Sequence, residues 1–408
     1  MKWPRKKFSD LYAVPSRNGL NRPSRVRGAG YKMVNMGELF ANDRIGNIPM
    51  DRVPLNEKEI IDCTLVEGDL LFARQSLVLE GAGKCSYILD ASETTTFESH
   101  LIRVRLDKAK AVPLFYYYLF SSPYSGISTI VQQCAQAGIR GSELGNLEVL
   151  YPEPDKQYEI AKVLGTYDDA IENNRRRMAL LEESARLLYE EWFVRLRFPG
   201  HEHTPISHGI PQGWERHRIG DVAECVGGGT PSTKVSNYWD DGDISWVTPT
   251  DVTRNDHFVL LDSQKRITEA GLQNSSAKVV PPHAVLMTSR ASVGFFAVAG
   301  REVCTNQGFI SVVPHDAIFS NFILFQLSHR VEEIRGMASG STFPEVSRGK
   351  FREFLIQVPP RRIVADFDEQ ASMFLKQIRI LKLQNQKLRA ARDLLLPRLM
   401  SGEIEVVD

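Results

Sequence analysis

The chain has 408 residues, of which 42% are hydrophobic, and its 50 basic and 50 acidic side chains cancel at neutral pH. This length provides apolar material for two cores, while a net charge of zero argues neither for nor against a nucleic-acid partner. No apolar run is long enough to cross a bilayer, the N-terminus lacks the apolar core of a secretory signal, and the five cysteines show no zinc spacing. We therefore expect a soluble, cytoplasmic protein.

The first 32 residues form a basic arm. They carry nine lysines and arginines against a single acidic residue, Asp10. A stretch with this excess of positive charge can follow a phosphate backbone. The alternative is a solvated, partly disordered N-terminal arm.

The rest of the chain alternates between compact modules and long helices. Residues 33–155 read as short strands and turns interrupted by one amphipathic helix, PLFYYYLFSSPY, and the stretch from 214 to 360 repeats that order. Each module is therefore expected to be α+β. The predicted parts are a first module with its basic arm (1–155), a first spacer helix (156–197), a Pro, Gly and His-rich linker (198–213), a second module (214–360), and a second spacer helix with a C-terminal tail (361–408).

Both long helices carry apolar residues at alternating spacings of three and four, which is a coiled-coil seam. The second seam lies about 207 residues after the first, so the chain is a duplicated unit. Other segments follow the same order: GDLLFAR lies over HAVLMTSR, and FESHLIRV over NQGFISV. The seam residues are Leu164, Ile171, Asn174, Leu181 and Leu188 in the first helix, and Ile378, Asn385, Leu388 and Leu395 in the second.

The charges of the two helices favour pairing. Residues 167–196 carry five basic and seven acidic side chains, whereas residues 371–400 carry seven basic ones and only Asp393. Asn174 and Asn385 are candidates for selecting the register of the pair, because a buried polar seam residue penalises misaligned pairings. The alternative is that both lie at the exposed edge of a frayed seam.

The search for catalytic chemistry gives no site. There is no GxxxxGK[ST] phosphate loop and no GxSxG elbow. The triplet Gly227 to Gly229 lacks the GxGxxG spacing, which favours a flexible turn or a close backbone approach to a ligand. Three histidines between 201 and 208 lie in the linker without a completing cysteine or carboxylate. We predict no catalytic residue, no metal and no cofactor bound by this chain.

The order of several longer segments resembles the specificity subunits of type I DNA restriction-modification systems. These segments are IPQGWERHRIGDVAECVGGGTPSTKVSNYWDDGDISWVTPTDV, which opens the second module, GSTFPEVSRGKFREFLIQVPP, which closes it, the helix TYDDAIENNRRRMALLEESARLLYEEWFVRLRF, and the terminal LLLPRLMSGEIEV. The resemblance covers nearly the whole chain. The first module departs from it, because it opens with SRNGLNRPSRVRGAGYKMVNMGEL and not with a PxGW-like opening.

The resemblance implies a division of labour. Each module is expected to be a target-recognition domain that reads one half of a bipartite, asymmetric site in double-stranded DNA. The helices are expected to form an antiparallel, pseudo-twofold spacer. Two modification subunits are expected to dock, carrying S-adenosylmethionine and the adenine-N6 methyltransferase site. Two restriction (motor-nuclease) subunits are further candidate partners, so the chain is a non-catalytic subunit of an enzyme complex.

Candidate DNA-binding residues follow from groove chemistry, in which Arg pairs with guanine, Asn or Gln with adenine, and any basic or hydroxyl group with phosphate. Arg74 and Arg290 each follow an apolar strand, and the duplication predicts that they are equivalent. The alternative for both is a salt bridge that locks the loop. QAGIRGS and ASGSTFP are predicted to be equivalent segments before the last strand. The remaining candidates are Lys84, Arg140, Ser142, Thr230, Ser232, Thr233, Lys234, Asn237, Ser341 and Thr342.

Two other classes of function stay open on the sequence. One is a coiled-coil adaptor that recruits proteins without a specific DNA target, and the other is a DNA methyltransferase or nuclease that acts alone. The basic arm and the arginine-bearing loops argue against the adaptor.

Overall fold

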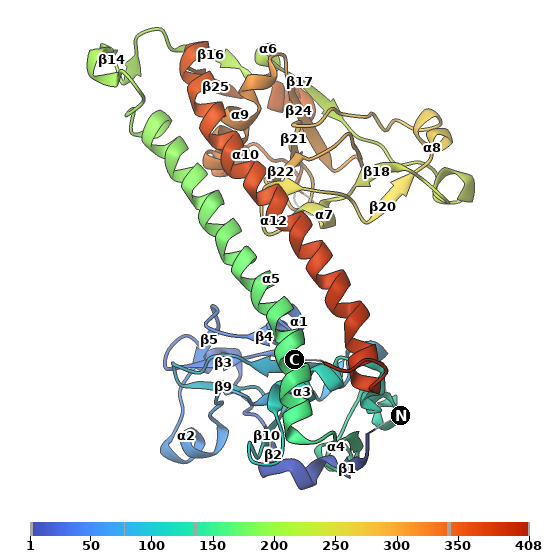
Figure 1. Cartoon of the computed structure of the whole chain (residues 1–408). Coiled ribbons are helices and arrows are strands. Elements are labelled where there is room, and N and C mark those ends of the chain that lie inside the picture. The colour runs from blue at the N-terminus through green and yellow to red at the C-terminus, as the bar shows by residue number, and fades with distance from the viewer. Residues whose placement is uncertain (1–2, 77, 134–136, 341–343, 407–408) are drawn as a thin grey trace. The chain divides into compact units, whose positions relative to one another are not determined.

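The computed structural model describes residues 3–406, except for 77, 134–136 and 341–343. The chain divides into two compact units, one made of Met1–Ile171 with Lys387–Asp408 and the other of Glu172–Gln386. Each unit contains one α+β module and part of both long helices (Figure 1). Within the described residues, no helix is both long enough and apolar enough to pass through a lipid bilayer.

The first module runs from β1 to β13. Its elements are β1 (Arg5–Lys7), β2 (Tyr12–Asn18), β3 (Tyr31–Val34), α1 (Met36–Ala41), β4 (Arg44–Ile45), β5 (Asp51–Val53), α2 (Glu57–Cys63), β6 (Leu70–Ala73), β7 (Gln75–Ser76), β8 (Cys85–Ile88), β9 (Thr95–Phe97), β10 (Leu101–Leu106), α3 (Pro113–Phe120), β11 (Gln132–Gln133), β12 (Ala137–Gly138), α4 (Gly141–Asn146) and β13 (Glu148–Leu150).

The second module runs from β16 to β25. Its elements are β16 (Glu215–Arg218), α6 (Ile219–Val222), β17 (Ala223–Gly227), β18 (Ile244–Val247), α7 (Pro249–Thr253), β19 (Val259–Leu260), β20 (Lys265–Ile267), α8 (Glu269–Gln273), β21 (Val285–Thr288), β22 (Phe296–Ala299), β23 (Cys304–Thr305), β24 (Phe309–Pro314), α9 (Ser320–His329), α10 (Val331–Gly336), α11 (Arg348–Arg352) and β25 (Leu355–Val358).

The two modules share one topology, which confirms the duplication. The five-stranded sheets have the orders β2-β10-β6-β8-β4 and β17-β24-β21-β22-β19, and in both only the last pair is parallel. The three-stranded sheets β5-β3-β9 and β20-β18-β23 also match in order and in strand direction. The pairs β1-β13 and β16-β25 complete the correspondence.

Central strands are buried on both faces, as their continuous apolar runs require. In β6, Leu70 and Phe72 pack into one cluster with α3, whereas Leu71 and Ala73 pack into a second cluster on the other face. Such alternation follows from the two-residue period of a strand. The prediction of an amphipathic helix at PLFYYYLFSSPY is wrong in one respect: all six residues from 115 to 120 in α3 are buried, because α3 is enclosed within this core.

The opening of the first module corrects a sequence interpretation. WPRKKFSDL at residues 3–11 occupies the place of WERHRIGDV at 214–222, with Trp3 matching Trp214 at an offset of 211. The first module therefore begins at its N-terminal strand and has the same tryptophan-led opening as the second. SRNGLNRPSRVRGAGYKMVNMGEL is the continuation of the module and not its start.

Basic residues of the first 32 belong to this folded module. Arg17 pairs with Asp62 at 3.1 Å, and Arg22 pairs with Glu59 at 2.6 Å, both on α2. A disordered arm is therefore wrong for residues 3–32, because strands β1 to β3 hold the backbone and acidic partners hold several of the side chains.

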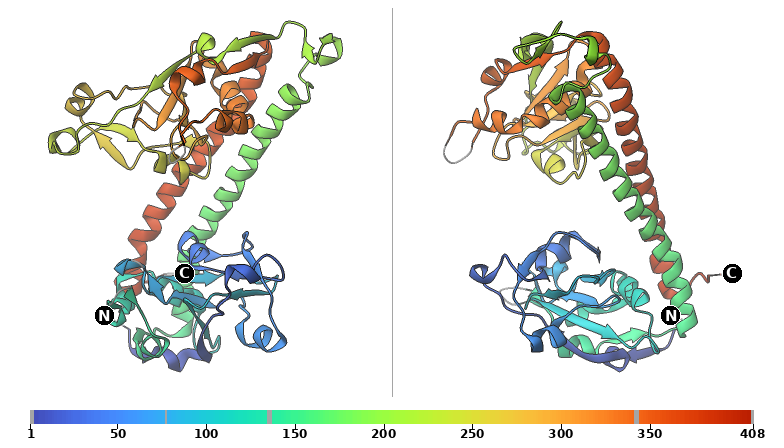
Figure 2. Two further views of the ribbon diagram at one scale, coloured as in Figure 1. Left: turned by 180° about the vertical axis from the view of Figure 1, so that it is seen from behind. Right: turned by 90° about the vertical axis from the view of Figure 1, so that its left-hand side faces the viewer.

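The long helices are α5 (Pro154–Tyr189), followed by a π-helical turn at Glu190–Val194, and α12 (Arg361–Ser401). In unit 2, Asn174 meets Asn385 while Trp192 meets Phe367, so the helices are antiparallel. In unit 1, Asp168 meets Arg392, and Leu164 shares a cluster with Leu396. Both helices are drawn in Figure 2. The predicted linker, residues 198–213, contains a short hairpin, β14 (Ile206–Ser207) with β15 (Ile210–Pro211).

Candidate nucleic-acid interface

In each module, four loop segments meet at one end of the strands of the five-stranded sheet. We call this feature the four-segment edge. In the first module it consists of residues 19–21, 74–75, 98–100 and 138–142, and in the second module of residues 228–230, 289–290, 306–308 and 345–349.

Backbone hydrogen bonds hold these segments together in the first module. The Leu20 amide donates to the Phe97 carbonyl at 2.9 Å, and the Arg74 amide donates to the His100 carbonyl at 2.8 Å. The Arg74 carbonyl in turn accepts from the Ile139 amide at 2.9 Å. Because the backbone of the edge is tied to the sheet, its side chains project from a rigid support.

The second module repeats these bonds one for one. The Gly229 amide donates to Thr305 at 2.9 Å, Ser289 donates to Gly308 at 2.8 Å, and Val346 donates to Ser289 at 2.9 Å. The two edges are therefore the same scaffold carrying different side chains.

This correspondence corrects the predicted equivalence of Arg74 and Arg290. Arg74 occupies the place of Ser289, and the counterpart of Arg290 is Gln75. Gln75 pairs with Gly138, while Arg290 forms a bridge with Glu345, which lies 207 residues after Gly138. A shift of one residue in an extended chain turns the side chain to the opposite face, so Arg74 and Arg290 do not play the same part.

The segments before the last strand also need a new alignment. QAGIRGS (136–142) corresponds at the 207-residue offset to FPEVSRG (343–349), and not to ASGSTFP. Arg140 therefore matches Ser347, and Gly141 matches Arg348. Ser341 and Thr342 lie outside the described residues, so their predicted role stays a prediction.

The candidate side chains on the edge differ in their exposure and in whether they pair with an acidic residue. Arg140 and Ser142 are exposed and Arg74 is half-buried, and within the described part of the chain neither arginine has an ion-pair partner. Arg290 Nε lies 3.7 Å from Glu345 Oε2, and the two side chains are 51% and 48% exposed. The predicted alternative of a salt bridge at Arg290 is therefore present, but in a long and solvated form that leaves the guanidinium accessible.

The glycine triplet is explained by contacts within the protein. A Cβ on Gly228 would lie 2.2 Å from the carbonyl oxygens of Thr305 and Asn306, and one on Gly19 would lie 2.1 Å from that of Phe97. Glycine is needed here because the backbone after β17, like that after β2, crosses the neighbouring turn at close range. The close approach predicted for the triplet is thus to the chain itself.

The polar residues after the triplet lie in a folded loop. The Thr230 hydroxyl donates to Gln307, and the Trp239 indole donates to the Ser232 carbonyl at 3.1 Å. The Asn237 carbonyl accepts from Thr268 at 2.8 Å, whereas the side chains of Thr233 and Lys234 are exposed. Trp239 packs edge-on against Trp246, so it belongs to a local apolar cluster.

Lys84 lies away from the other candidates. Its ammonium group donates to the Phe40 carbonyl at 2.9 Å and pairs with Asp43 at 3.2 Å. Both partners lie at the end of α1 and hold the ammonium group there. Of the sequence candidates, Lys84 is therefore the one that the geometry supports least for contact with DNA.

Several edge residues were missed by sequence reasoning. Gln75 and His100 in the first module and Gln307 and Arg348 in the second lie on the same segments as the predicted candidates. Extending the 207-residue offset upstream from the long helices would have aligned residues 138–142 with 345–349, the segment that contains Arg348. Gln75 needed the strand pairing, because the loops after β6 and β21 differ in length.

The seam residues come together as the heptad pattern predicts. Asn174 Nδ2 donates to Asn385 Oδ1 at 2.9 Å, and both residues are buried, so the frayed-edge alternative is wrong. Leu164, Ile171 and Ile378 are buried, and the half-buried seam residues are Leu181, Leu188, Leu388 and Leu395.

Buried polar contacts attach each module to its helices. In unit 1, the Tyr118 hydroxyl donates to Asp168 at 2.6 Å, and Arg392 pairs with the same carboxylate. In unit 2, Glu182 on α5 accepts from the Phe258 amide at 2.7 Å. Burial opposes ionisation of Glu182, but hydrogen bonds from His257, Phe258 and Arg186 outweigh it and lower its pKa.

Comparison with known proteins identifies the class that this duplicated α+β fold defines. The model of the type I restriction modification DNA specificity domain matches residues 10–183 and again 211–390. The chain belongs to this family. The double match falls on the two modules with their adjoining helices, as the duplication requires.

Individual relatives agree with the family. The chain is 36% identical over 152 residues to the type I restriction enzyme MjaIX specificity subunit of Methanocaldococcus jannaschii, covering 37% of this chain and 35% of that protein. It is 21% identical over 323 residues to the HindI specificity subunit of Haemophilus influenzae, covering 64% of this chain and 70% of that one. The aligned region thus spans about a third of the first relative.

A solved structure supports the fold of the whole chain. The type I restriction-modification S subunit from M. genitalium matches over 98% of this chain and 96% of its own length, with a TM-score of 0.59 and 15% identity. At this identity, the match supports the architecture alone.

Proposed function

We propose that the chain is the sequence-specific DNA-recognition subunit of a type I restriction-modification complex. In this proposal each module reads one half of a bipartite site in double-stranded DNA. The observation that carries it is the repetition of one rigid four-segment edge with different side chains, for example Gln75 in one module and Arg290 in the other. Identical supports with different reading groups select different sequences, so the two halves of the site are expected to differ.

The chemistry of the edges suits the major groove. An arginine guanidinium can form two hydrogen bonds with guanine, and a glutamine or asparagine amide can form two with adenine. Serine, threonine and lysine side chains contact phosphates. Arg140 and Ser142 in the first module and Arg290 and Arg348 in the second are exposed on the edge. Thr233 and Lys234, also exposed, are candidates for backbone contacts, which position the protein without reading sequence.

Exposed leucines on the long helices suit protein partners. Leu180 and Leu187 on α5 are 69% and 46% exposed and seven residues apart, and Leu394 on α12 is 66% exposed. Leu187 and Leu394 are 207 residues apart and belong to different units, so each unit exposes one leucine at this repeated position. An apolar stripe at heptad spacing fits another helix.

These surfaces are proposed to receive two modification subunits, with S-adenosylmethionine and adenine-N6 methyl transfer on those partners. Restriction subunits are proposed to join the same assembly. The chain itself is proposed to hold no active site and to work in the cytoplasm, where chromosomal DNA is accessible.

Binding selection from a random DNA library tests the proposal. The chain, assembled with its modification subunit, is expected to enrich a two-part sequence with a fixed unread gap. Inserting four residues into both helices, between the seam positions, should change the gap and leave both half-sites unchanged, because the modules themselves are not altered. Enrichment of no sequence would contradict DNA recognition, and altered half-sites would contradict the spacer role.

The two alternatives make different predictions. An adaptor would bind the modification subunit through the leucine surfaces and show no sequence preference. A stand-alone methyltransferase would transfer label from radiolabelled S-adenosylmethionine to DNA with no partner present. We expect label transfer only when the modification subunit is added.

A further inference from the structure

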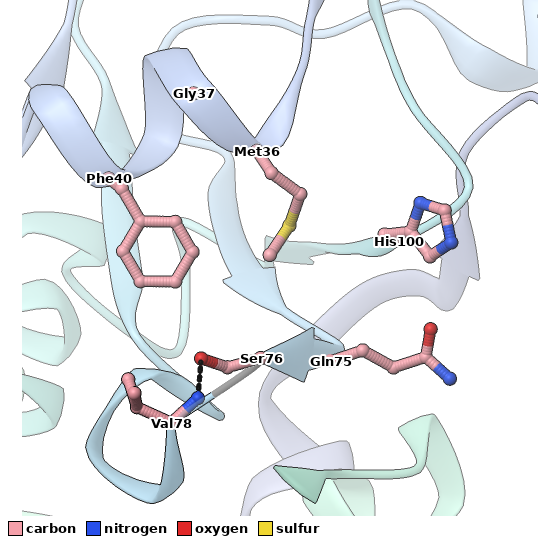
Figure 3. Close-up of a pocket in the computed structure, with 7 residues that line it drawn as sticks. All are labelled: Met36, Gly37, Phe40, Gln75, Ser76, Val78 and His100. Atoms are coloured by element: carbon pink, nitrogen blue, oxygen red, sulfur yellow. Dashed lines mark hydrogen bonds between the residues drawn. The ribbon is translucent and has the colours of Figure 1, made fainter. Parts of the chain in front are cut away.

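A pocket of about 500 Å³ opens beside the four-segment edge of the first module (Figure 3). It is lined by Met36, Gly37, Phe40, Gln75, Ser76, Val78 and His100. Two of these residues, Gln75 and His100, belong to the edge itself. The pocket therefore continues the surface that is proposed to face DNA.

The lining divides into an apolar end and a polar end. Figure 3 shows Phe40 and Val78 on one side, the Gln75 amide and the His100 ring on the other, and the Met36 thioether between them. Phe40 is 39% exposed and Val78 is 60% exposed. Exposed apolar side chains next to a hydrogen-bonding amide are suited to a ligand with one methyl group and one polar edge.

Hydrogen bonds fix the backbone at Gln75, whereas its side chain forms no hydrogen bond within the described residues. Gln75 pairs with Gly138 between β7 and β12, and the residue before it is bonded to His100 and Ile139. Within the described residues, the side-chain amide of Gln75 has no hydrogen-bond partner. Both its donor and its acceptor are thus available to a ligand, at little cost in backbone ordering.

We propose that Gln75 and this pocket read one A·T base pair in the half-site of the first module, and that Arg290 reads a G·C pair at the equivalent step of the other half-site. A glutamine amide bonds N6 and N7 of adenine, and the thymine 5-methyl group meets Phe40 and Val78 at the apolar end. This inference rests on the proposed DNA-recognition function and deepens it by naming the reading groups.

The second module has the complementary chemistry at the same place. Between the matched bonds at Ala73–Gly83 and Thr288–Gly294, the first module has residues 74–82 and the second only 289–293. The shorter loop of the second module has no counterpart of the Val78 segment. Beside Arg290 lies Glu345, so an arginine fork for guanine stands next to an acceptor for the cytosine amino group.

Reciprocal substitution tests the assignment in the full assembly with the modification subunit. Base preferences are measured by binding selection for the unmodified chain, for Gln75→Arg and for Arg290→Gln. Gln75→Arg is expected to change one pair of one half-site from A·T to G·C, and Arg290→Gln to make the opposite change in the other half. Each original pair should lose about five- to hundredfold in preference, the range of a bidentate base contact.

Matched controls lie off the edge. Arg301 is 45% exposed and pairs with Asp262 at 3.6 Å, nearly the same state as Arg290, so Arg301→Gln should leave both half-sites unchanged. Gln212→Arg, an exposed glutamine in the linker, serves for Gln75. If the unmodified chain selects a two-part site but neither edge substitution changes a base, the assignment is wrong and the proposed function stands. If the unmodified chain selects nothing, the proposed function itself fails.

Uracil tests the apolar end separately. Replacing the thymine of the assigned A·T pair by uracil removes only the 5-methyl group, and affinity is expected to fall about fourfold, the effect of one buried methyl group. The same replacement at a thymine outside both half-sites should have no effect. If uracil at the assigned pair leaves the affinity unchanged, the pocket does not recognise the thymine methyl group.

Discussion

Asn174 and Asn385 hydrogen-bond to each other across the paired long helices at 2.9 Å, with both side chains buried. A polar pair inside an apolar seam costs stability but penalises every misaligned register, because a shift would break the hydrogen bond between the two buried amides. The pair therefore fixes which residues of α5 and α12 meet. Its position matters for any function that depends on how the helices align.

Replacing one of the two asparagines by leucine should destabilise the protein by about 1–3 kcal/mol, since the remaining buried amide loses the bond that joins the pair. The double variant Asn174→Leu with Asn385→Leu should recover most of this loss. Urea unfolding of the four proteins in a double-mutant cycle measures the coupling. A loss in the double variant equal to the sum of the two single losses would show that the bond does not link the helices.

Arg392 and Asp168 form a second test of the helix pair, in unit 1. The two side chains are 19% and 8% exposed, and Tyr118 also donates to Asp168. Arg392→Met should cost about 3–5 kcal/mol because it leaves a buried carboxylate without its charge partner. Arg398→Met, which removes an exposed pair with Glu403, is the control and should cost about 0–1 kcal/mol. Similar losses in the two variants, seen by thermal unfolding, would argue against a structural role for the buried pair.

The lowered pKa of Glu182 predicts a pH dependence of stability. Its stabilising effect is complete above the unfolded pKa of about 4.3 and is lost as the pH falls through the lower value in the fold. Melting temperatures measured from pH 6 to pH 3 should therefore fall less steeply for Glu182→Gln than for the unmodified chain. Parallel curves would show that Glu182 is not held ionised by His257, Phe258 and Arg186.

Close backbone packing at Gly228 gives a fourth prediction. Gly228→Ala should destabilise the second module by about 2–3 kcal/mol, because the added Cβ meets two carbonyl oxygens that belong to the backbone and must shift. Gly349→Ala, where nothing lies within 4 Å of the added carbon, is the control. Differential unfolding of the two variants decides the matter, and a tolerated Gly228→Ala would show that the turn at Thr305 is not closely packed.

The sequence predicted the duplication, the α+β modules and the seam because regular helices keep a constant offset and a constant period. The buried strand at Leu70 and its counterpart at Val285 were readable for the same reason, since each is a continuous apolar run. Loops of different length change the offset between equivalent residues of the two modules. Arg74 and Arg290 looked equivalent because both follow a strand, whereas the hydrogen bonds pair Arg290 with Gln75.

The matching openings at Trp3 and Trp214 were missed for a related reason. Their offset is 211 and not 207, so the correspondence appears only when β1 and β16 are seen to pair with the last strand of each module. The role of Gly228 could not be predicted from the sequence either, because its close neighbours lie about 77 residues further along the chain.

Mapping of methylated adenines in a genome is the most direct test of two independent reading edges. Cells with the modification subunit and the unmodified chain should show one two-part motif, which is absent without the chain. With Arg290→Ala, the half-site of the second module should lose its preference at one base pair while the other half-site stays intact. Loss of preference in both halves, or an unchanged half-site of the second module, would contradict the account.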